Sequence, residues 1–290
     1  MNPAFVPRRS VLYMPGSNAR AIAKAKELPV DSVILDLEDS VADTQKELAR
    51  RQACEAVQAG GFGLREIVIR VNGDGTPWHD DDVASVIAAA PAGIVLPKVE
   101  SGDVVKRIAG AIEAKNPQSE MKIWCMLETP RGVLACNEIL QSHPRLAVAV
   151  MGTSDLTRDL RALHTATRLP LITSLGLCLL AARAHGVCIL DGVHLNLDDE
   201  PGFAEACRQG RALGFDGKTL VHPRQIPTCN AAFSPTPEEL ETARVIVSAF
   251  ASAREKGQGV VVVGGRLVEE LHVIEAKRVL GIHQALTQAE

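Results

Sequence analysis

Short apolar runs rich in Val, Ile and Leu recur along the chain, and more polar segments separate them. Eight such runs lie at residues 10–14, 32–37, 66–71, 93–99, 122–127, 146–151, 187–193 and 218–222. Within each run nearly every position is apolar, which is typical of parallel strands that are covered on both faces. The number of residues from one run to the next is mostly that of one strand followed by one helix.

The segments between the runs have the periodicity of amphipathic helices, most clearly at 20–28, 45–58 and 203–213. Eight parallel strands that alternate with helices predict an α/β fold, a (β/α)8 barrel. The alternative is a doubly wound open sheet, which normally carries a glycine-rich phosphate loop directly after its first strand. The glycine clusters of this chain instead precede apolar runs, and this order favours the barrel.

The end of the chain departs from this alternation. Residues 235–259 predict one long helix that starts near a proline, and residues 260–286 predict a hairpin followed by a second helix. We therefore expect a catalytic barrel domain over residues 1–234. We expect residues 235–290 to form a C-terminal helical extension that packs on the barrel or on a neighbouring subunit.

Composition excludes several classes of function. Hydrophobic residues make up 46% of the 290 positions, enough for a large core, whereas the net charge of −4 and 3% aromatic residues argue against a nucleic-acid partner. No apolar run is long enough for a transmembrane helix, so we expect no membrane partner. The seven cysteines form no CxxC pair, which is typical of reduced thiols in a cytoplasmic protein without structural zinc.

Charged residues stand where several predicted strands end, which is where barrel enzymes carry their active sites. Glu128 follows the fifth apolar run, Asp155 follows the sixth, and Arg70 lies near the end of the third. A group of acids stands at the end of the second run: Asp36, Glu38 and Asp39.

Two carboxylates on adjacent strands suit Mg²⁺, which takes one or two protein carboxylates and keeps its other positions for water and substrate oxygens. Glu128 and Asp155 therefore predict a Mg²⁺ site for a 2-oxo acid, with Arg70 beside the oxygen that gains negative charge. Three structural interpretations stay open: Glu128 in an exposed loop, Asp155 as a helix cap, and Arg70 in a structural ion pair. Lys98, near the end of the fourth run, is an alternative Schiff-base lysine, although a metal pair makes that role unnecessary.

Several ordered motifs resemble the citrate lyase β-subunit-like group of the HpcH/HpaI aldolase superfamily. They are RSVLYMPGSN, LDLEDSV, VIRVNG, LPKVE, LETPRGV, MGTSDLTRDL and GFDGKTLVHPRQI, between residues 9 and 226, and DGVHLNLDDEPGF is typical of its CoA-ester lyase members. The resemblance implies a TIM barrel that assembles as a homotrimer or hexamer and uses Mg²⁺. It matches Glu128 and Asp155 to the metal ligands and Arg70 to the substrate-binding arginine.

The resemblance also implies a reaction, the cleavage of a carbon–carbon bond in a 3-hydroxyacyl-CoA of the malyl-, citramalyl- or citryl-CoA type. The products would be acetyl-CoA and a 2-oxo acid. Arg70 would be catalytic, because it would stabilise the thioester enolate. Glu128 would bind substrate through the metal, and Lys218, in GFDGK, is a candidate for binding the phosphates of CoA.

Family members often carry a catalytic aspartate in a C-terminal GKMID-P-H-like segment, which can reach the active site of a neighbouring subunit. The corresponding segment here is GGRLVEELH, in which Glu269 takes the place of the aspartate and Leu271 that of the proline. We expect Glu269 to be the acid/base, although its extra methylene also favours thioester hydrolysis as an alternative. Further alternatives are a citrate lyase β subunit acting on a carrier-protein thioester, an aldolase for a free hydroxy-oxo acid, and a non-catalytic homologue.

Overall fold

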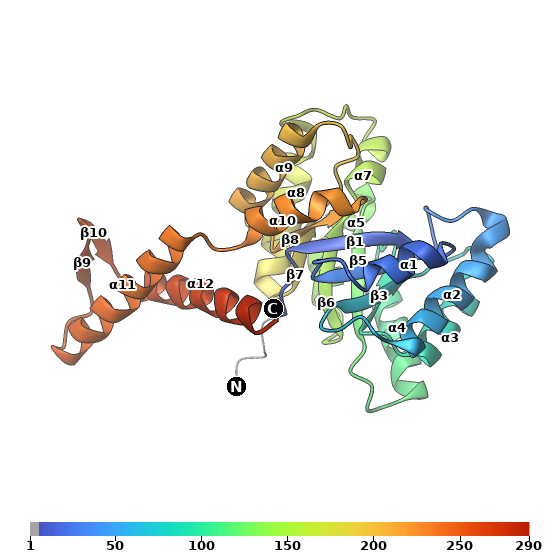
Figure 1. Cartoon of the computed structure of the whole chain (residues 1–290), viewed down its shortest axis with the longest axis horizontal. Coiled ribbons are helices and arrows are strands. Elements are labelled where there is room, and N and C mark those ends of the chain that lie inside the picture. The colour runs from blue at the N-terminus through green and yellow to red at the C-terminus, as the bar shows by residue number, and fades with distance from the viewer. Residues whose placement is uncertain (1–5, 290) are drawn as a thin grey trace. The chain divides into compact units, whose positions relative to one another are not determined.

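The computed structural model describes residues 6–289 of the chain (Figure 1). Contacts between Cα atoms divide it into two compact units, of which the first is Arg8–Phe233 and the second consists mainly of the residues from Ser234 onward. This division lies next to the predicted boundary at residue 234. The packing of the second unit on the barrel or on a neighbouring subunit stays a prediction.

The first unit is a closed barrel of eight parallel strands, in which each strand pairs with the next along the chain and β1 pairs with β8. The strands are β1 (Ser10–Pro15), β2 (Ser32–Asp36), β3 (Glu66–Arg70), β4 (Gly93–Leu96), β5 (Lys122–Leu127), β6 (Leu146–Met151), β7 (Cys188–Asp191) and β8 (Gly217–Leu220). The predicted (β/α)8 barrel is thus confirmed, and every predicted strand is present.

Helices follow the strands around the barrel (Figure 1). They are α1 (Ala19–Ala25), α2 (Lys46–Ala59), α3 (His79–Ala89), α4 (Gly102–Lys115), α5 (Pro130–Leu134), α6 (Cys136–Leu140), α7 (Thr153–Asp159), α8 (Ile172–His185), α9 (Glu200–Leu213) and α10 (Ile226–Phe233). Short 3-10 turns lie at Asp43–Gln45, Leu169–Leu171 and Pro223–Gln225. None of the helices between residues 6 and 289 has the length and apolar character to cross a bilayer.

Alternate residues of each strand face two separate cores. One core fills the inside of the barrel and includes Trp124, which is fully buried, with residues from all strands but β8: Val11, Ile34, Val68, Val95, Met126, Val148, Val150 and Leu190. The other core lies between strands and helices, and it includes the neighbouring strand residues Leu12, Leu35 and Ile69. Burial on both sides explains why the runs are apolar at nearly every position.

Strand β4 ends earlier than its apolar run, and the cause is local. Pro97 has no backbone N–H to donate, and Lys98 has a left-handed backbone conformation with φ of 51°. Strand β5 ends in a similarly defined turn. The Thr129 hydroxyl accepts a hydrogen bond from the Gly132 N–H at 3.0 Å, and Pro130 opens α5. These two turns define the backbone next to Glu128, which directly follows β5.

The second unit contains two long helices and a hairpin, in the predicted order: α11 (Pro237–Glu255), β9 (Val261–Val263), β10 (Arg266–Val268) and α12 (Glu270–Ala289). The start of α11 is a capping box, because Thr236 and Glu239 each accept a hydrogen bond from the backbone of the other. A small apolar core of Phe250, Val268 and Val273 joins the hairpin to the helices.

Candidate active site

A cavity of about 290 Å³ lies where the strands of the barrel end. Its walls include three of the residues that the sequence predicts for the metal and the substrate: Arg70, Glu128 and Asp155. The remaining wall comes from β1, β2, β5, β6 and β8, from the start of α7 and from the loops after β2, β6, β7 and β8: Tyr13, Asp36, Asp39, Ser40, Met126, Met151, Gly152, Thr153, Ser154, Val193, Leu195, Thr219 and Val221. The structure thus brings together charges that are far apart in the sequence.

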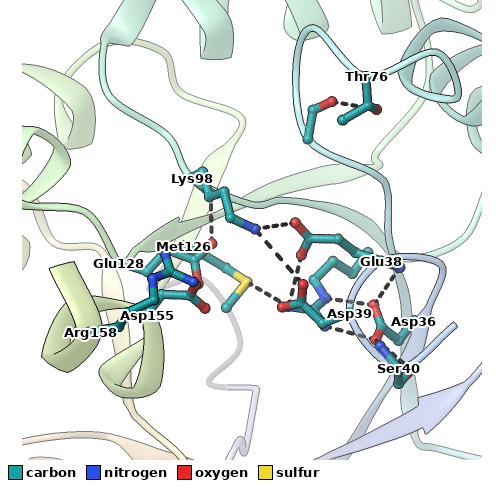
Figure 2. A network of polar contacts seen from close by, with 12 residues as sticks. Asp36, Glu38, Asp39, Ser40, Thr76, Lys98, Met126, Glu128, Asp155 and Arg158 are labelled. Atoms are coloured by element: carbon teal, nitrogen blue, oxygen red, sulfur yellow. Dashed lines mark hydrogen bonds and ion pairs between the residues drawn. The ribbon is translucent and has the colours of Figure 1, made fainter. Parts of the chain in front are cut away.

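Glu128 directly follows β5 and is only 1% exposed, so the exposed-loop interpretation is wrong. Its Oε1 accepts a hydrogen bond from the backbone N–H of Lys98 at 2.7 Å, as Figure 2 shows. The left-handed conformation of Lys98 turns this N–H toward the carboxylate. Its second oxygen, Oε2, is buried and has no hydrogen-bond partner among the described residues.

The electrostatic environment of Glu128 is unfavourable for a lone carboxylate. Burial and, to a lesser extent, the charge of Glu38 raise the pKa of Glu128 to about 7, because Arg70 and Lys98 only partly offset these two effects. A cation at the unpartnered Oε2 would remove this penalty. The carboxylate therefore fits the predicted metal, and Mg²⁺ prefers this kind of oxygen ligand.

Asp155 is the third residue of α7, and its side chain is 17% exposed. Its Oδ1 lies 2.6 Å from Nη1 of Arg158, one turn further along the helix, and Figure 2 shows both side chains beside Glu128. The helix cap is Gly152, so the capping interpretation of Asp155 is wrong. Within residues 6–289 no group of three or more His, Cys, Asp and Glu side chains is placed to hold a metal. Two carboxylates are nevertheless a common protein share of a Mg²⁺ site.

Gly152 gives Glu128 its space. A Cβ atom at this position would stand 2.2 Å from Oε2 of Glu128, well inside van der Waals contact. We expect Gly152→Ala to displace the carboxylate and to weaken Mg²⁺ binding by at least tenfold, measured by isothermal titration calorimetry, without changing the far-ultraviolet circular dichroism.

Gly176→Ala on α8 is the matched control, because nothing lies within 4 Å of a Cβ there. Equal Mg²⁺ affinity in the Gly152→Ala protein and the control would contradict the assignment of Glu128 to the metal.

Arg70 is held rigidly at the end of β3. Its Nε and Nη2 lie 2.6 and 2.7 Å from the two carboxylate oxygens of Asp36, and its side chain is 7% exposed. Its Nη1 lies 3.0 Å from Glu38 and 3.4 Å from Asp39. Burial lowers the pKa of Arg70, but the charge and hydrogen bonds of Asp36 outweigh this and raise it well above its ordinary value. Arg70 therefore has a structural ion pair and also presents a fixed cation to the cavity.

The acids at the end of β2 and in the loop after it hold cations in place. Asp36 is fully buried and also accepts a hydrogen bond from the Ser40 hydroxyl at 2.5 Å. Glu38 forms an ion pair with the ammonium of Lys98 (Figure 2). Burial lowers the pKa of Lys98, yet the hydrogen bond and charge of Glu38 raise it above its ordinary value. A lysine that stays protonated is a poor nucleophile, so the Schiff-base alternative loses support.

Lys218, the candidate for CoA phosphates, lies on β8 and is 1% exposed. Its Nζ contacts Oδ2 of Asp191 at 2.8 Å, and the same carboxylate receives Nη1 of Arg168 at 2.6 Å. Lys218 is not among the residues that line the cavity. Because its ammonium is enclosed beside Asp191, we do not include Lys218 in the site proposed below.

Glu269 belongs to the second unit, where it directly precedes α12. Its side chain is exposed, and its backbone N–H donates a hydrogen bond to Nδ1 of His272 at 3.1 Å. Its role as acid/base stays a prediction.

Sequence analysis missed three parts of the site. Tyr13 stands near the end of the first apolar run, a position that could have drawn attention because the chain contains a single tyrosine. Gly152 stands between the sixth run and Asp155. The third part is the backbone N–H of Lys98, for which the sequence carries no signal, since every residue but proline has one.

A parallel barrel with a buried carboxylate, a second acid and a fixed guanidinium at its strand ends has the site of a TIM-barrel enzyme. Residues 9–223 match the family described as HpcH/HpaI aldolase/citrate lyase, and the chain belongs to this family. The resemblance noted from the sequence motifs is therefore confirmed.

Named relatives span nearly the whole chain. A (3S)-malyl-CoA thioesterase of Cereibacter sphaeroides is 43% identical over 280 residues, which cover 97% of this chain and 96% of the relative. A citrate lyase subunit beta of Leuconostoc mesenteroides is 32% identical and covers 96% of this chain and 94% of the relative. The CitE protein of Mycobacterium tuberculosis, in a crystal structure with magnesium, acetoacetate and coenzyme A, has a TM-score of 0.75 and 30% identity. That match covers 93% of this chain and 96% of the CitE chain.

Proposed function

We propose that this protein is a Mg²⁺-dependent enzyme that acts on a 3-hydroxyacyl-CoA of the malyl-CoA type, and that its net reaction is hydrolysis of the thioester. The observation that carries the metal-dependent part is the buried, unpartnered Oε2 of Glu128 in a cavity that also contains Asp155 and Arg70. The 43% identity to a (3S)-malyl-CoA thioesterase over nearly the full length favours hydrolysis.

The residues of the chain have distinct tasks in this proposal. Glu128 and Asp155 would hold the metal, and Lys98 would keep Glu128 in place through its backbone N–H. Bound Mg²⁺ would act as a Lewis acid for the 3-hydroxyl and carboxylate oxygens of the acyl group. Arg70, fixed by Asp36, would face the thioester oxygen as negative charge develops there. Glu269 would act as the acid/base.

Carbon–carbon cleavage to acetyl-CoA and a 2-oxo acid is the second candidate. It is favoured by the family and by Arg70, since a fixed guanidinium would also stabilise the thioester enolate that this cleavage leaves behind. The two candidates use the same metal and the same arginine. They differ in which bond breaks, and therefore in their products.

The test is to incubate the protein with (3S)-malyl-CoA and Mg²⁺ and to identify the products by mass spectrometry. Hydrolysis would release free CoA and malate, and carbon–carbon cleavage would release acetyl-CoA and glyoxylate. We expect free CoA and malate, and we expect EDTA to stop the reaction. Citramalyl-CoA and citryl-CoA, assayed in parallel, measure the choice of acyl group. If none of the three thioesters is consumed, the proposal is wrong and a non-catalytic homologue becomes the better explanation.

A further inference from the structure

The hydroxyl of Tyr13 has no strong hydrogen-bond acceptor among residues 6–289. Tyr13 lies on β1, and its side chain lines the cavity. The printed sequence contains no other tyrosine. Its Oη contacts Sδ of Met126 at 3.7 Å, and a thioether is a weak acceptor. Among the described residues, the hydroxyl makes no other hydrogen bond. A stronger acceptor in the cavity would therefore replace the sulfur of Met126 as its partner.

Arg70 approaches the same sulfur atom. Its Nη1, which also contacts Glu38 at 3.0 Å and Asp39 at 3.4 Å, lies 3.6 Å from Sδ of Met126. The guanidinium of Arg70 lies 4.9 Å from the centre of the Tyr13 ring. Because Asp36 holds the other two nitrogens of the guanidinium, Arg70 cannot turn away from this position. Two donors, one of them charged, thus converge on one weak acceptor in the wall of the cavity.

The phenol stays protonated under all ordinary conditions. Burial raises the pKa of Tyr13, and this effect outweighs the nearby charge of Arg70, which lowers it. The hydroxyl therefore acts as a hydrogen-bond donor. A proton donor beside a fixed guanidinium is the arrangement that stabilises a developing oxyanion.

We propose that Tyr13 Oη and Arg70 Nη1 together bind the carbonyl oxygen of the substrate thioester, and that Tyr13 is a catalytic residue of this site. This inference rests on the proposed function, and it applies to both candidate reactions. In hydrolysis, the oxygen of water adds to the carbonyl carbon while the acid/base takes a proton from the water, and the C=O electron pair moves to oxygen. The pair returns as the C–S bond breaks, and the CoA thiolate takes up the proton. In carbon–carbon cleavage, the 3-hydroxyl gives its proton to the acid/base and its oxygen forms the C=O of the 2-oxo acid. The electron pair of the broken bond becomes the thioester enolate, whose carbon is then protonated to give acetyl-CoA. The negative charge stands on the same oxygen in each case, and Tyr13 keeps its proton.

The experiment compares acetyl-CoA with S-ethyl-CoA, which has a methylene in place of the carbonyl group. Affinities for both are measured by isothermal titration calorimetry on the wild-type protein and on Tyr13→Phe. We expect the wild type to prefer acetyl-CoA, and we expect Tyr13→Phe to reduce this preference by about fivefold, the value of one ordinary hydrogen bond, while Arg70 maintains the rest. S-ethyl-CoA should bind equally to both proteins. A Tyr13→Phe protein that keeps the full preference, or that loses affinity for both compounds alike, would overturn the inference.

A spectroscopic measurement reports on the hydroxyl itself. Because Tyr13 is the single tyrosine, protein labelled with ¹³C at the tyrosine Cζ gives one resonance. We expect acetyl-CoA to shift this resonance and S-ethyl-CoA to leave it nearly unchanged. Equal shifts with the two compounds would show that the hydroxyl does not sense the carbonyl, and would also overturn the inference.

Measuring the turnover of malyl-CoA by the wild type and by Tyr13→Phe distinguishes failure of this inference from failure of the proposed function. We expect Tyr13→Phe to lower kcat for malyl-CoA by about a hundredfold with a smaller change in KM, as for other oxyanion donors. If the wild type consumes malyl-CoA and Tyr13→Phe keeps its kcat, the inference fails while the proposed function stands. If the wild type neither consumes malyl-CoA nor binds acetyl-CoA, both fail. Tyr13→Phe keeps the ring over Arg70, so it is expected to fold normally.

Discussion

Replacing Glu128 with glutamine is expected to lower Mg²⁺-dependent turnover of the thioester by about a thousandfold, because it removes the charge of the most deeply buried candidate ligand. Glutamine keeps the size of the side chain and an oxygen for the Lys98 N–H. The loss should therefore come from the missing charge, and steady-state kinetics at saturating Mg²⁺ would measure it.

Although Glu128→Gln should lower activity, we expect it to raise the stability of the metal-free protein at alkaline pH. The pKa of Glu128 is about 7 in the folded protein, above its ordinary value of 4.5. Protonation of Glu128 therefore favours the folded state below about pH 4.5, and this contribution is lost as the pH rises through 7. At pH 8 the metal-free wild type contains an uncompensated buried charge. We expect metal-free Glu128→Gln to be more stable there, by on the order of 2 kcal/mol.

Unfolding in urea at pH 8 and pH 4.5, with and without Mg²⁺, would measure this difference. The gain of the variant should nearly vanish at pH 4.5. Mg²⁺ at about 100 times its dissociation constant should stabilise the wild type at pH 8 by about 2.7 kcal/mol and leave the variant unchanged. A variant that Mg²⁺ stabilises as strongly as the wild type would show that the metal does not bind at Glu128.

Replacing Asp36 with asparagine is expected to lower the free energy of unfolding by about 3 kcal/mol, because it leaves the buried guanidinium of Arg70 without its bidentate partner. The variant should also lose activity, since Arg70 would no longer be fixed. Asp39→Asn is the matched control. Asp39 also contacts Arg70, at 3.4 Å, but its side chain is 56% exposed, so its removal should cost less than about 1 kcal/mol.

The pH dependence of the Asp36 effect follows from its pKa. Burial raises the pKa of Asp36, but the charge and hydrogen bonds of Arg70, with those of Ser40, hold it below its ordinary value of 3.8. The ion pair therefore contributes its full stability above about pH 4, and this contribution is lost as the pH falls through the lowered folded pKa. The difference between wild type and Asp36→Asn should be constant from pH 5 to 8. Equal destabilisation by the Asp36 and Asp39 variants would contradict the bidentate pair as the main support of Arg70.

The sequence was sufficient to predict the barrel, because strands buried on both faces leave an apolar signal at nearly every position. It was also sufficient to predict that Glu128, Asp155 and Arg70 lie close together, since charges at the ends of such strands lie at the rim of the barrel. Their roles at the metal and the substrate stay predictions.

The surroundings of the Lys218 side chain could not be predicted from the sequence. The pairing of β7 with β8 places Lys218 opposite Asp191, and their side chains meet in a fully buried ion pair. Strand register depends on the whole barrel, so neighbouring sequence letters do not reveal it. The backbone of Lys98 is a second example, because its left-handed conformation follows from the turn after Pro97 and from its contact with Glu128.

The close contact between Gly152 and Glu128 also bears on how this protein can diverge. Every amino acid other than glycine has a Cβ atom, so each missense change at codon 152 would put an atom where the carboxylate lies. Positions around the rim, such as the largely exposed Arg158, can vary in small steps with small losses. Codon 152 offers no such steps. Among descendants of this gene, the residue there would therefore separate lineages that keep the proposed metal site from lineages that have lost it.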